Sequence, residues 1–338
     1  MRDCVLLLES DADRAEVDRA LRRLGVWSVA LGDGTALQVA SHSQAVDDRT
    51  LASLPGVAKV MMARSEHPLL DAQAGVAVTL GQARGASAPV RCGPGAEPLL
   101  LAGPCSAESE ETAWQAAAMA AAAGAKVLRG GAFKPRTSPY AYRGDGATAL
   151  RWLREAADAH GLLLVSEAMS EAHAAEVAEY ADVVQVGSRS MASYGLLSAI
   201  GTLGRPVLLK RGQSATLQEW RLAAEHLLAA GAAGVVLCER GIAGVDRETR
   251  NVLDLGAVAL IAGIDGHAIV VDPSHAAGRR DLVVPLAQAG LSAGAHGVLV
   301  EAHPDAGNAR SDAAQAIDAA TLQAIGASVR KAAQREDG

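Results

Sequence analysis

The chain has 338 residues, enough for one large domain and a smaller one, and half of them are hydrophobic, so a sizeable core is available. Aromatic residues make up only 3% of the chain, so Ala, Val and Leu must build that core. The net charge of −7 argues against a nucleic-acid-binding or membrane-binding surface, so any anion site must be a local basic patch.

Cysteine usage and the lack of targeting signals predict a cytoplasmic protein. Cys4, Cys92, Cys105 and Cys238 form no CxxC pair and are typical of cytosolic thiols rather than of a disulfide framework. No basic region followed by a long apolar run opens the chain, so we expect no signal peptide. No apolar stretch has the length and hydrophobicity of a membrane span.

Residues 1–62 predict a small α/β unit with the element order βαββαβ, which is that of a ferredoxin-like module. We expect strands at 4–8, 26–31, 36–40 and 57–61, a helix capped by Asp11, and a short helix at 48–54. Gly32-Asp33-Gly34 is a strong hairpin signal. Modules of this kind bind small ligands or pair with one another, so a regulatory role and an assembly role both stay open.

Residues 63–98 predict a linker with one hairpin, since an apolar run at 76–80 is followed by a Gly/Ala/Ser-rich passage and by CGPG. From residue 99 onward, short apolar runs alternate with Ala/Leu-rich helical stretches. The runs cover 99–102, 127–128, 162–165, 183–186, 207–209, 235–237, 269–271 and 298–300. Eight such strands alternating with helices predict a parallel (β/α)8 TIM barrel over residues 99–338. A doubly wound open sheet is the alternative, and the lack of a GxGxxG motif after the first run disfavours it.

Cations follow many of these runs, and active sites of such barrels lie at the carboxyl ends of the strands. The fifth and sixth runs each end in a charged pair, Lys210 with Arg211 and Glu239 with Arg240. Like charges in one mouth are costly unless an anion fills it, so the cations predict a ligand with more than one anionic group. The cations expected around this mouth are Arg129, Lys134, Arg136, Arg189, Lys210 and Arg240.

A second group at the same end combines a thiol, an imidazole and two carboxylates: Cys105, His275, Glu301 and Asp312. Such a mixed set suits Zn, Fe, Mn or Co, because the thiolate disfavours Mg and Ca. His303 also follows the eighth run and competes for the imidazole position. The spacing is too long for a local metal motif, so this hypothesis depends on the barrel bringing the four residues together.

Seven ordered motifs in residues 99–338 resemble those of the 3-deoxy-D-arabino-heptulosonate 7-phosphate (DAHP) synthases. The best resemblance is to the type I branch that carries an N-terminal ferredoxin-like domain, although the N-terminal likeness is architectural only. The motifs are GPCSAES from Gly103, LRGGAFKPRTSPY from Leu128, LLKRG from Leu208, CERGI from Cys238, TRNVLDL from Thr249, DPSHAAGRRD from Asp272, and EAHP…SDAAQ from Glu301.

The resemblance implies a metal-dependent, aldol-type condensation of phosphoenolpyruvate with erythrose 4-phosphate, giving DAHP and phosphate in the first step of the shikimate pathway. It implies that the four-residue group binds the metal, that Lys134 is a candidate general acid, and that Arg136 and Thr137 contact erythrose 4-phosphate. The residues implied to hold phosphoenolpyruvate are Arg129, Lys134, Arg189, Lys210 and Arg240, with Glu167 nearby. A homo-oligomer (dimer or tetramer) and feedback inhibition by an aromatic amino acid, usually tyrosine or phenylalanine, are also implied.

The chain departs from the family after the fourth run, where GSRSMASYG stands in place of the usual GARNMQN. Arg189 is retained, while Ser188, Ser190, Ala192 and Ser193 replace family residues, so a different aldehyde substrate in a specialised pathway stays open. One alternative is the octulosonate 8-phosphate synthase reaction with arabinose 5-phosphate, disfavoured because KPRTS stands where that family has a KANR-type sequence. A non-catalytic sensor of phosphorylated metabolites is a third reading, disfavoured by the complete metal and phosphate sets.

Overall fold

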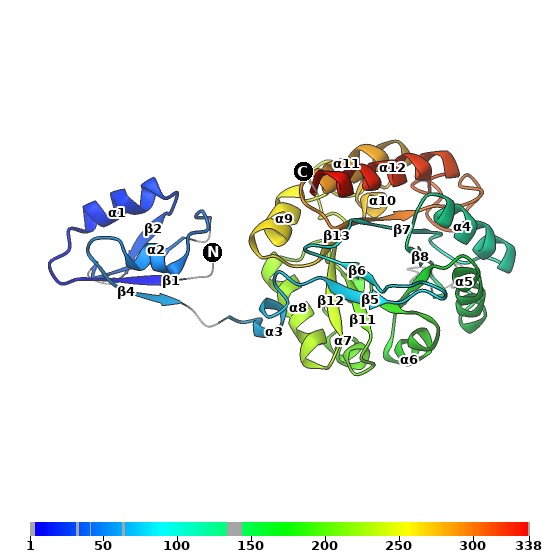
Figure 1. The fold of residues 1–338 in the computed structure, drawn as a ribbon, viewed down its shortest axis with the longest axis horizontal. Coiled ribbons are helices and arrows are strands. Elements are labelled where there is room, and N and C mark those ends of the chain that lie inside the picture. The colour runs from blue at the N-terminus through cyan, green and yellow to red at the C-terminus, as the bar shows by residue number, and fades with distance from the viewer. Residues whose placement is uncertain (1–3, 32–33, 41, 63–64, 134–143, 337–338) are drawn as a thin grey trace. The chain divides into compact units, whose positions relative to one another are not determined.

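The computed structural model describes residues 4–31, 34–40, 42–62, 65–133 and 144–336 (Figure 1). The chain divides into two compact units, Met1–Glu66 and His67–Gly338, each of which is described by itself. Among the helices in the described ranges, none is both long and apolar enough to cross a membrane.

The N-terminal unit is a four-stranded antiparallel sheet with two helices, which confirms the predicted ferredoxin-like order. The strands lie in the order β2-β3-β1-β4. Asp13, and not Asp11 as predicted, caps α1, because its carboxylate accepts a hydrogen bond from the Ala15 amide at 2.9 Å. The elements are β1 (Cys4–Leu8), α1 (Arg14–Arg23), β2 (Ser28–Leu31), β3 (Ala36–Val39), α2 (Asp48–Ala52) and β4 (Val57–Met62).

The second unit contains the predicted closed barrel of eight parallel strands, with helices around it (Figure 1). Each strand pairs with the next along the chain, and β14 closes the ring on β7. The strands are β7 (Leu99–Gly103), β8 (Val127–Arg129), β9 (Leu163–Ala168), β10 (Val183–Val186), β11 (Pro206–Lys210), β12 (Gly234–Glu239), β13 (Ile269–Val271) and β14 (Gly297–Glu301).

The helices between the strands bury small residues against the outside of the barrel. In α4, for example, Ala113, Ala117 and Ala120 are fully buried, and side chains of this size let the helix lie close to the sheet. The helices are α4 (Glu110–Ala122), α5 (Ala147–Ala159), α6 (Glu171–Tyr180), α7 (Tyr194–Gly201), α8 (Leu217–Ala229), α9 (Leu255–Ala259), α10 (Pro273–Ala277), α11 (Val283–Ser292) and α12 (Ala319–Glu336), with short turns η1 (Ser188–Ser190), η2 (Leu260–Ile264) and η3 (Arg280–Leu282).

A short helix and a hairpin precede the barrel: α3 (Pro68–Asp71), β5 (Val78–Gly81) and β6 (Val90–Cys92). The two strands pair antiparallel, and Val78, Leu80 and Cys92 pack in one cluster with residues at the beginnings of the barrel strands, such as Leu99 and Val127. The hairpin therefore covers the amino-terminal end of the barrel and leaves the carboxyl end for the site.

Side chains alternate along each strand, and this alternation sends polar groups into the barrel at its carboxyl end. In β9, Leu163 and Val165 belong to the interior cluster, so the next inward position is Glu167. By the same count, Leu208 leads to Lys210 in β11 and Leu299 leads to Glu301 in β14. An apolar interior thus gives way to a polar layer within two residues.

Candidate active site

Four of the six predicted cations line one cavity at the carboxyl end of the barrel, together with Glu167. Arg129, Lys210 and Arg240 are buried, while Arg189 is exposed on the turn η1. Lys134, Arg136 and Thr137, the other predicted site residues, lie outside the described residues. The barrel therefore places cations from four different strand ends around one space.

Two of these cations form buried ion pairs. An Arg129 guanidinium nitrogen lies 2.7 Å from Glu301 Oε1, and Lys210 Nζ lies 2.6 Å from Asp272 Oδ2. Burial works against the charge of Arg129, but Glu301 together with nearby Cys105 and Asp272 raises its pKa overall. Burial also opposes ionisation of Asp272, yet His275 and Lys210 hold its pKa well below the usual range.

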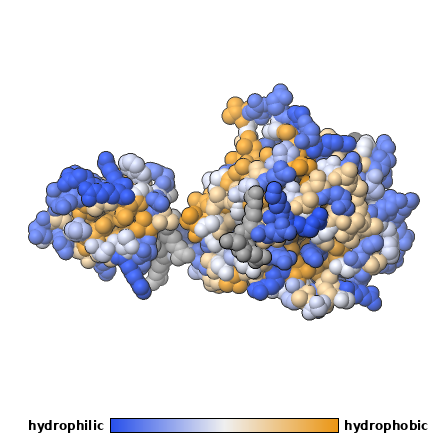
Figure 2. Space-filling view, turned by 45° about the horizontal axis from the view of Figure 1, so that its top comes forward, coloured by the Kyte–Doolittle hydropathy of each residue, from blue (hydrophilic) through white to orange (hydrophobic). Residues whose placement is uncertain are grey.

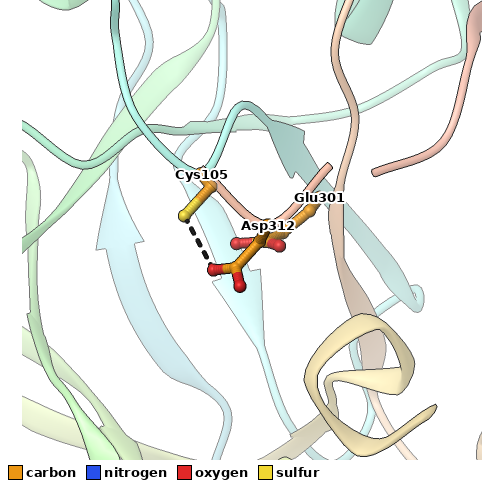
Figure 3. A group of neighbouring side chains, drawn as sticks. All are labelled: Cys105, Glu301 and Asp312. Atoms are coloured by element: carbon orange, nitrogen blue, oxygen red, sulfur yellow. Dashed lines mark hydrogen bonds between the residues drawn. The ribbon is translucent and has the colours of Figure 1, made fainter. Parts of the chain in front are cut away.

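Cys105, Glu301 and Asp312 meet at one point (Figure 3), and one ligand atom from each lies within 4.8 Å of the others. Cys105 Sγ lies 3.2 Å from Asp312 Oδ2, to which it donates, and 3.1 Å from Ser311 Oγ. Asp312 has a φ of 54°, in the left-handed region, which aspartate tolerates better than most residues. Asp312, which is distant in sequence, thus lies next to Cys105 at the carboxyl end of β7.

His275, the fourth predicted ligand, lies beside Glu301. Its Nδ1 lies 2.7 Å from Asp272 Oδ2, and its Nε2 lies 3.3 Å from Glu301 Oε1. An imidazole that donates from Nδ1 to Asp272 would offer its other nitrogen, Nε2, to a metal ion.

Cys105, Glu301 and Asp312 form the group whose ligand atoms all lie close enough together to share one ion, and a thiolate with two carboxylates suits a divalent transition metal; His275 lies outside that three-residue group. Neighbouring ligand atoms on one ion, each bonded at about 2.1 Å, lie roughly 3 to 3.5 Å apart, and the Cys105–Asp312 and His275–Glu301 separations of 3.2 and 3.3 Å fall in that range. His303, the competing imidazole, lies apart from this group: its Nδ1 accepts from the Asp305 amide, and its Nε2 is 3.9 Å from a Glu108 oxygen.

Glu167 is fixed by two neighbours that the motifs did not single out. Gln185 Nε2 donates to Glu167 Oε2 at 3.0 Å, and Gly187 passes so close that a Cβ there would lie 2.0 Å from Glu167 Oε1. Gln185 was predictable in principle, because it lies two residues after Val183, which faces the barrel interior.

Arg211 and Glu239 lie outside the cavity, although each is adjacent in sequence to a cation that lines it. An Arg211 guanidinium nitrogen lies 2.9 Å from Glu239 Oε2 and 3.0 Å from Asp254 Oδ2. Glu239 Oε1 accepts from the Gly241 amide at 2.7 Å, and burial raises the pKa of Glu239. This network holds the backbone on either side of Arg240.

Gln315 and Arg250 are further site residues to which the sequence assigned no role. Arg250 lines the cavity, and one of its guanidinium nitrogens donates to Gln315 Oε1 at 2.8 Å. Gln315 Nε2 in turn donates to Glu301 Oε2. Both residues belong to motifs of the resemblance, TRNVLDL and SDAAQ, but no local spacing indicated that they meet.

Comparisons with known proteins identify the family. Residues 75–335 match the model of the DAHP synthetase I family. A phospho-2-dehydro-3-deoxyheptonate aldolase from Thermotoga maritima is 48% identical over 219 residues, which is 65% of this chain and 65% of that protein. A 2-dehydro-3-deoxyphosphooctonate aldolase from Caulobacter vibrioides is 30% identical over 256 residues, 70% of this chain and 88% of its own.

Solved structures extend the likeness to the N-terminal unit. The crystal structure of the phospho-2-dehydro-3-deoxyheptonate aldolase (DAHP synthase) from Thermotoga maritima matches with a TM-score of 0.75 and 34% identity, over 99% of this chain and 98% of that one. A truncated form of 3-deoxy-D-arabino-heptulosonate 7-phosphate synthase from the same organism matches with a TM-score of 0.68 and 43% identity, over 73% and 90% of the two chains. The matched family model covers most of the barrel unit and all four residues of the thiol, imidazole and carboxylate group, so the chain belongs to the DAHP synthetase I family.

Proposed function

We propose that this protein condenses phosphoenolpyruvate, erythrose 4-phosphate and water to give DAHP and inorganic phosphate, the first step of the shikimate pathway, in the cytoplasm. The observation that carries the proposal is one cavity lined both by five cations, four of them predicted from the sequence, and by Cys105, His275 and Asp312. A doubly anionic substrate and a metal-polarised carbonyl need these two sets side by side.

Each set has its own task in this reaction. Arg129, Arg189, Lys210 and Arg240 hold the carboxylate and phosphate of phosphoenolpyruvate and neutralise the phosphate as it leaves. A divalent Mn, Fe, Co or Zn ion held by the four-donor group would polarise the aldehyde oxygen as a Lewis acid.

The family motif that follows β8 in the sequence, whose residues 134–137 lie outside the described residues, completes the proposal. Lys134 is the proposed general acid, and Arg136 and Thr137 are proposed to contact erythrose 4-phosphate.

Phosphate release from phosphoenolpyruvate tests the reaction directly. We expect release with erythrose 4-phosphate and a divalent transition metal, and none when either the aldehyde or the metal is withheld. Cys105→Ala should still bind phosphoenolpyruvate, because the cations remain, but should not turn over. Full activity of Cys105→Ala in the presence of a chelator would exclude the metal role.

A different aldose phosphate is the second candidate, because Ser188 and Ser190 line the cavity beside Arg189 where the family usually has other residues. Running the assay with arabinose 5-phosphate separates the two: faster release with arabinose 5-phosphate would favour an octulosonate-type substrate. Binding of phosphoenolpyruvate without release for any aldose would instead indicate a sensor.

We further propose that the N-terminal unit (residues 1–62) regulates or assembles a homo-oligomer, dimer or tetramer, with 63–98 as the connection to a catalytic domain at 99–338. One face of its sheet is apolar and uncovered: Val29 and Met61 are exposed, and Val5 is the register partner of Met61. Figure 2 shows apolar residues gathered on the visible face of this unit. Such a face suits a second copy or an aromatic amino acid effector, tyrosine or phenylalanine.

Truncation tests the regulatory role. The cut belongs before His67, because Leu70 is buried in the barrel core and Glu225 accepts hydrogen bonds from the Leu69 and Leu70 amides. We expect the truncated protein to stay active and to lose inhibition by tyrosine or phenylalanine. Inhibition that persists would place the effector site on the barrel, and a full-length protein indifferent to both amino acids would favour assembly.

A further inference from the structure

We propose that Gln315 and Arg250 are positioning residues of the metal centre, which fix its two carboxylates and offset their charge. Neither is a proposed ligand: Gln315 donates a hydrogen bond to Glu301, and Arg250, which lines the cavity, lies against Asp312. The inference rests on the proposed function only in taking Cys105, His275, Glu301 and Asp312 as ligands.

Gln315 is a buried amide with both ends engaged. Its Nε2 donates to Glu301 Oε2 at 2.5 Å, and its Oε1 accepts from an Arg250 guanidinium nitrogen at 2.8 Å. The opposite orientation of the amide would set oxygen against carboxylate and nitrogen against guanidinium, so the two partners fix it. Glu301 is thereby held through one oxygen by Gln315 and through the other by Arg129 at 2.7 Å.

The segment that carries Arg250 also contacts the other side of the centre. The same Arg250 nitrogen lies 3.4 Å from Asp312 Oδ1. Asn251, the next residue, donates from its side chain to the His275 backbone carbonyl at 2.9 Å. Two consecutive residues of the β12–α9 loop therefore reach Asp312 and His275 directly, and reach Glu301 through Gln315.

The backbone of this segment is itself anchored. The Arg250 and Asn251 amides donate to the carbonyls of Ala277 and Ala276 at 2.9 and 2.8 Å. These carbonyls belong to α10, the helix that carries His275. A movement of the loop would therefore disturb three of the four donors together.

Charge explains why the central residue is a neutral amide. One thiolate and two carboxylates carry three negative charges, so a divalent ion leaves one in excess, and Arg129 and Arg250 lie against the carboxylates that carry it. A glutamate at position 315 would place a fourth anion 2.5 Å from Glu301 Oε2 and pull Arg250 away from Asp312.

The test is the affinity of the full-length protein for Co²⁺, measured by chelator competition and by the thiolate-to-cobalt absorption band. We expect Gln315→Glu to weaken binding by roughly 10- to 100-fold, the range for residues that orient metal ligands, and Arg250→Ala to weaken it less. Gln288→Glu makes the same chemical change at an exposed position of α11 and should bind Co²⁺ as the wild type does. Arg250 has 43% of its side chain exposed, so Arg250→Ala guards against a Gln315 variant that fails to fold.

Unchanged Co²⁺ affinity in folded Gln315→Glu and Arg250→Ala would overturn the inference, and so would an equal loss in Gln288→Glu. A purely structural role would lower the unfolding temperature of the metal-free variants without changing the cobalt band, which also contradicts it. Phosphate release is measured separately: a wild type that binds Co²⁺ but releases no phosphate would refute the proposed reaction and leave the positioning role standing.

Discussion

Replacing Glu239 by glutamine is expected to destabilise the barrel strongly, although Glu239 does not line the cavity. Its carboxylate is fully buried between the sheet and the helices, where it accepts from Arg211 at 2.9 Å and from the Gly241 amide at 2.7 Å. In Glu239→Gln only one end of the side chain can still accept. The other end presents an amide to a group that is itself a donor.

The magnitude follows from burial and from what remains after the change. Removing one partner of a buried ion pair costs about 3–5 kcal/mol. In the variant, the Arg211 guanidinium still has Asp254 at 3.0 Å and the Ala215 carbonyl at 3.1 Å, so its buried charge keeps two partners. We therefore expect the lower end, about 3 kcal/mol, which is a large share of the roughly 5–15 kcal/mol by which proteins of this kind are stable.

Urea unfolding followed by far-UV circular dichroism measures this loss, at a mildly alkaline pH because burial raises the pKa of Glu239. Arg279–Asp281 is the matched control, because its 2.8 Å separation is the same within error while both side chains are about half exposed. Asp281→Asn should leave the urea midpoint essentially unchanged, since solvent screens that pair. Replacing both Arg211 and Glu239 by apolar residues should recover part of the loss.

A loss below about 1 kcal/mol for Glu239→Gln, the scale of an exposed pair, would refute this reasoning. So would a double variant less stable than Glu239→Gln alone. We also expect Glu239→Gln to raise the KM for phosphoenolpyruvate, because Gly241 and the neighbouring Arg240 lose their anchor.

Two further predictions concern the cavity and a helix end. Gly187→Ala should raise the KM for phosphoenolpyruvate by roughly tenfold, about 1.4 kcal/mol, because the backbone φ of −72° accepts alanine while the new Cβ displaces Glu167. Gly263→Ala is the control, because no atom lies within 4 Å of the Cβ that it adds. Equal KM values for the two variants would contradict the contact between position 187 and Glu167. Glu219 completes a capping box with Thr216, which lowers its pKa below 4.5. A carboxyl group whose pKa is lowered by folding stabilises the protein above pH 4.5, and this stabilisation is lost as the pH falls through the pKa of the folded state. The melting temperatures of the wild type and of Glu219→Gln should therefore differ at pH 7 and converge in acid. A difference that stays constant with pH would contradict this prediction.

Much of the fold could be predicted because its signals are local. Each barrel strand is a short apolar run, and eight runs separated by helical stretches leave few architectures. The prediction of the helix cap in the N-terminal unit was wrong for an equally local reason. Asp11 and Asp13 are both suitable capping residues, and only the course of the backbone decides that Asp13 reaches the Ala15 amide. Some barrel strands also end later than predicted, because polar residues such as Glu167 and Glu301 continue the strand after its apolar part ends.

The partners of the site residues could not be predicted, because they depend on loops that meet only in the folded barrel. Gln315 follows a long segment after β14, and Arg250 lies in the loop after β12. Nothing in either local sequence specifies that an amide will link Glu301 to a guanidinium. Asp272 was predictable only in part. Its position directly after β13 can be seen in the sequence, but its simultaneous contact with Lys210 and His275 depends on the geometry of the folded barrel.

Strand geometry alone distinguishes the charged residues that face the cavity from the charged residues next to them in sequence. Lys210 and Arg211 are neighbours, as are Glu239 and Arg240, and charge alone gives no reason to assign one of each pair to the cavity. Counting by two from the last inward apolar residue does so: Leu208 leads to Lys210, and Val236 and Cys238 lead to Arg240. Arg211 and Glu239 are out of phase with that count, and they meet each other in a buried ion pair instead of facing the cavity. At the carboxyl end of a barrel strand, therefore, the phase of the apolar run separates a charge that faces the cavity from one that forms an ion pair outside it.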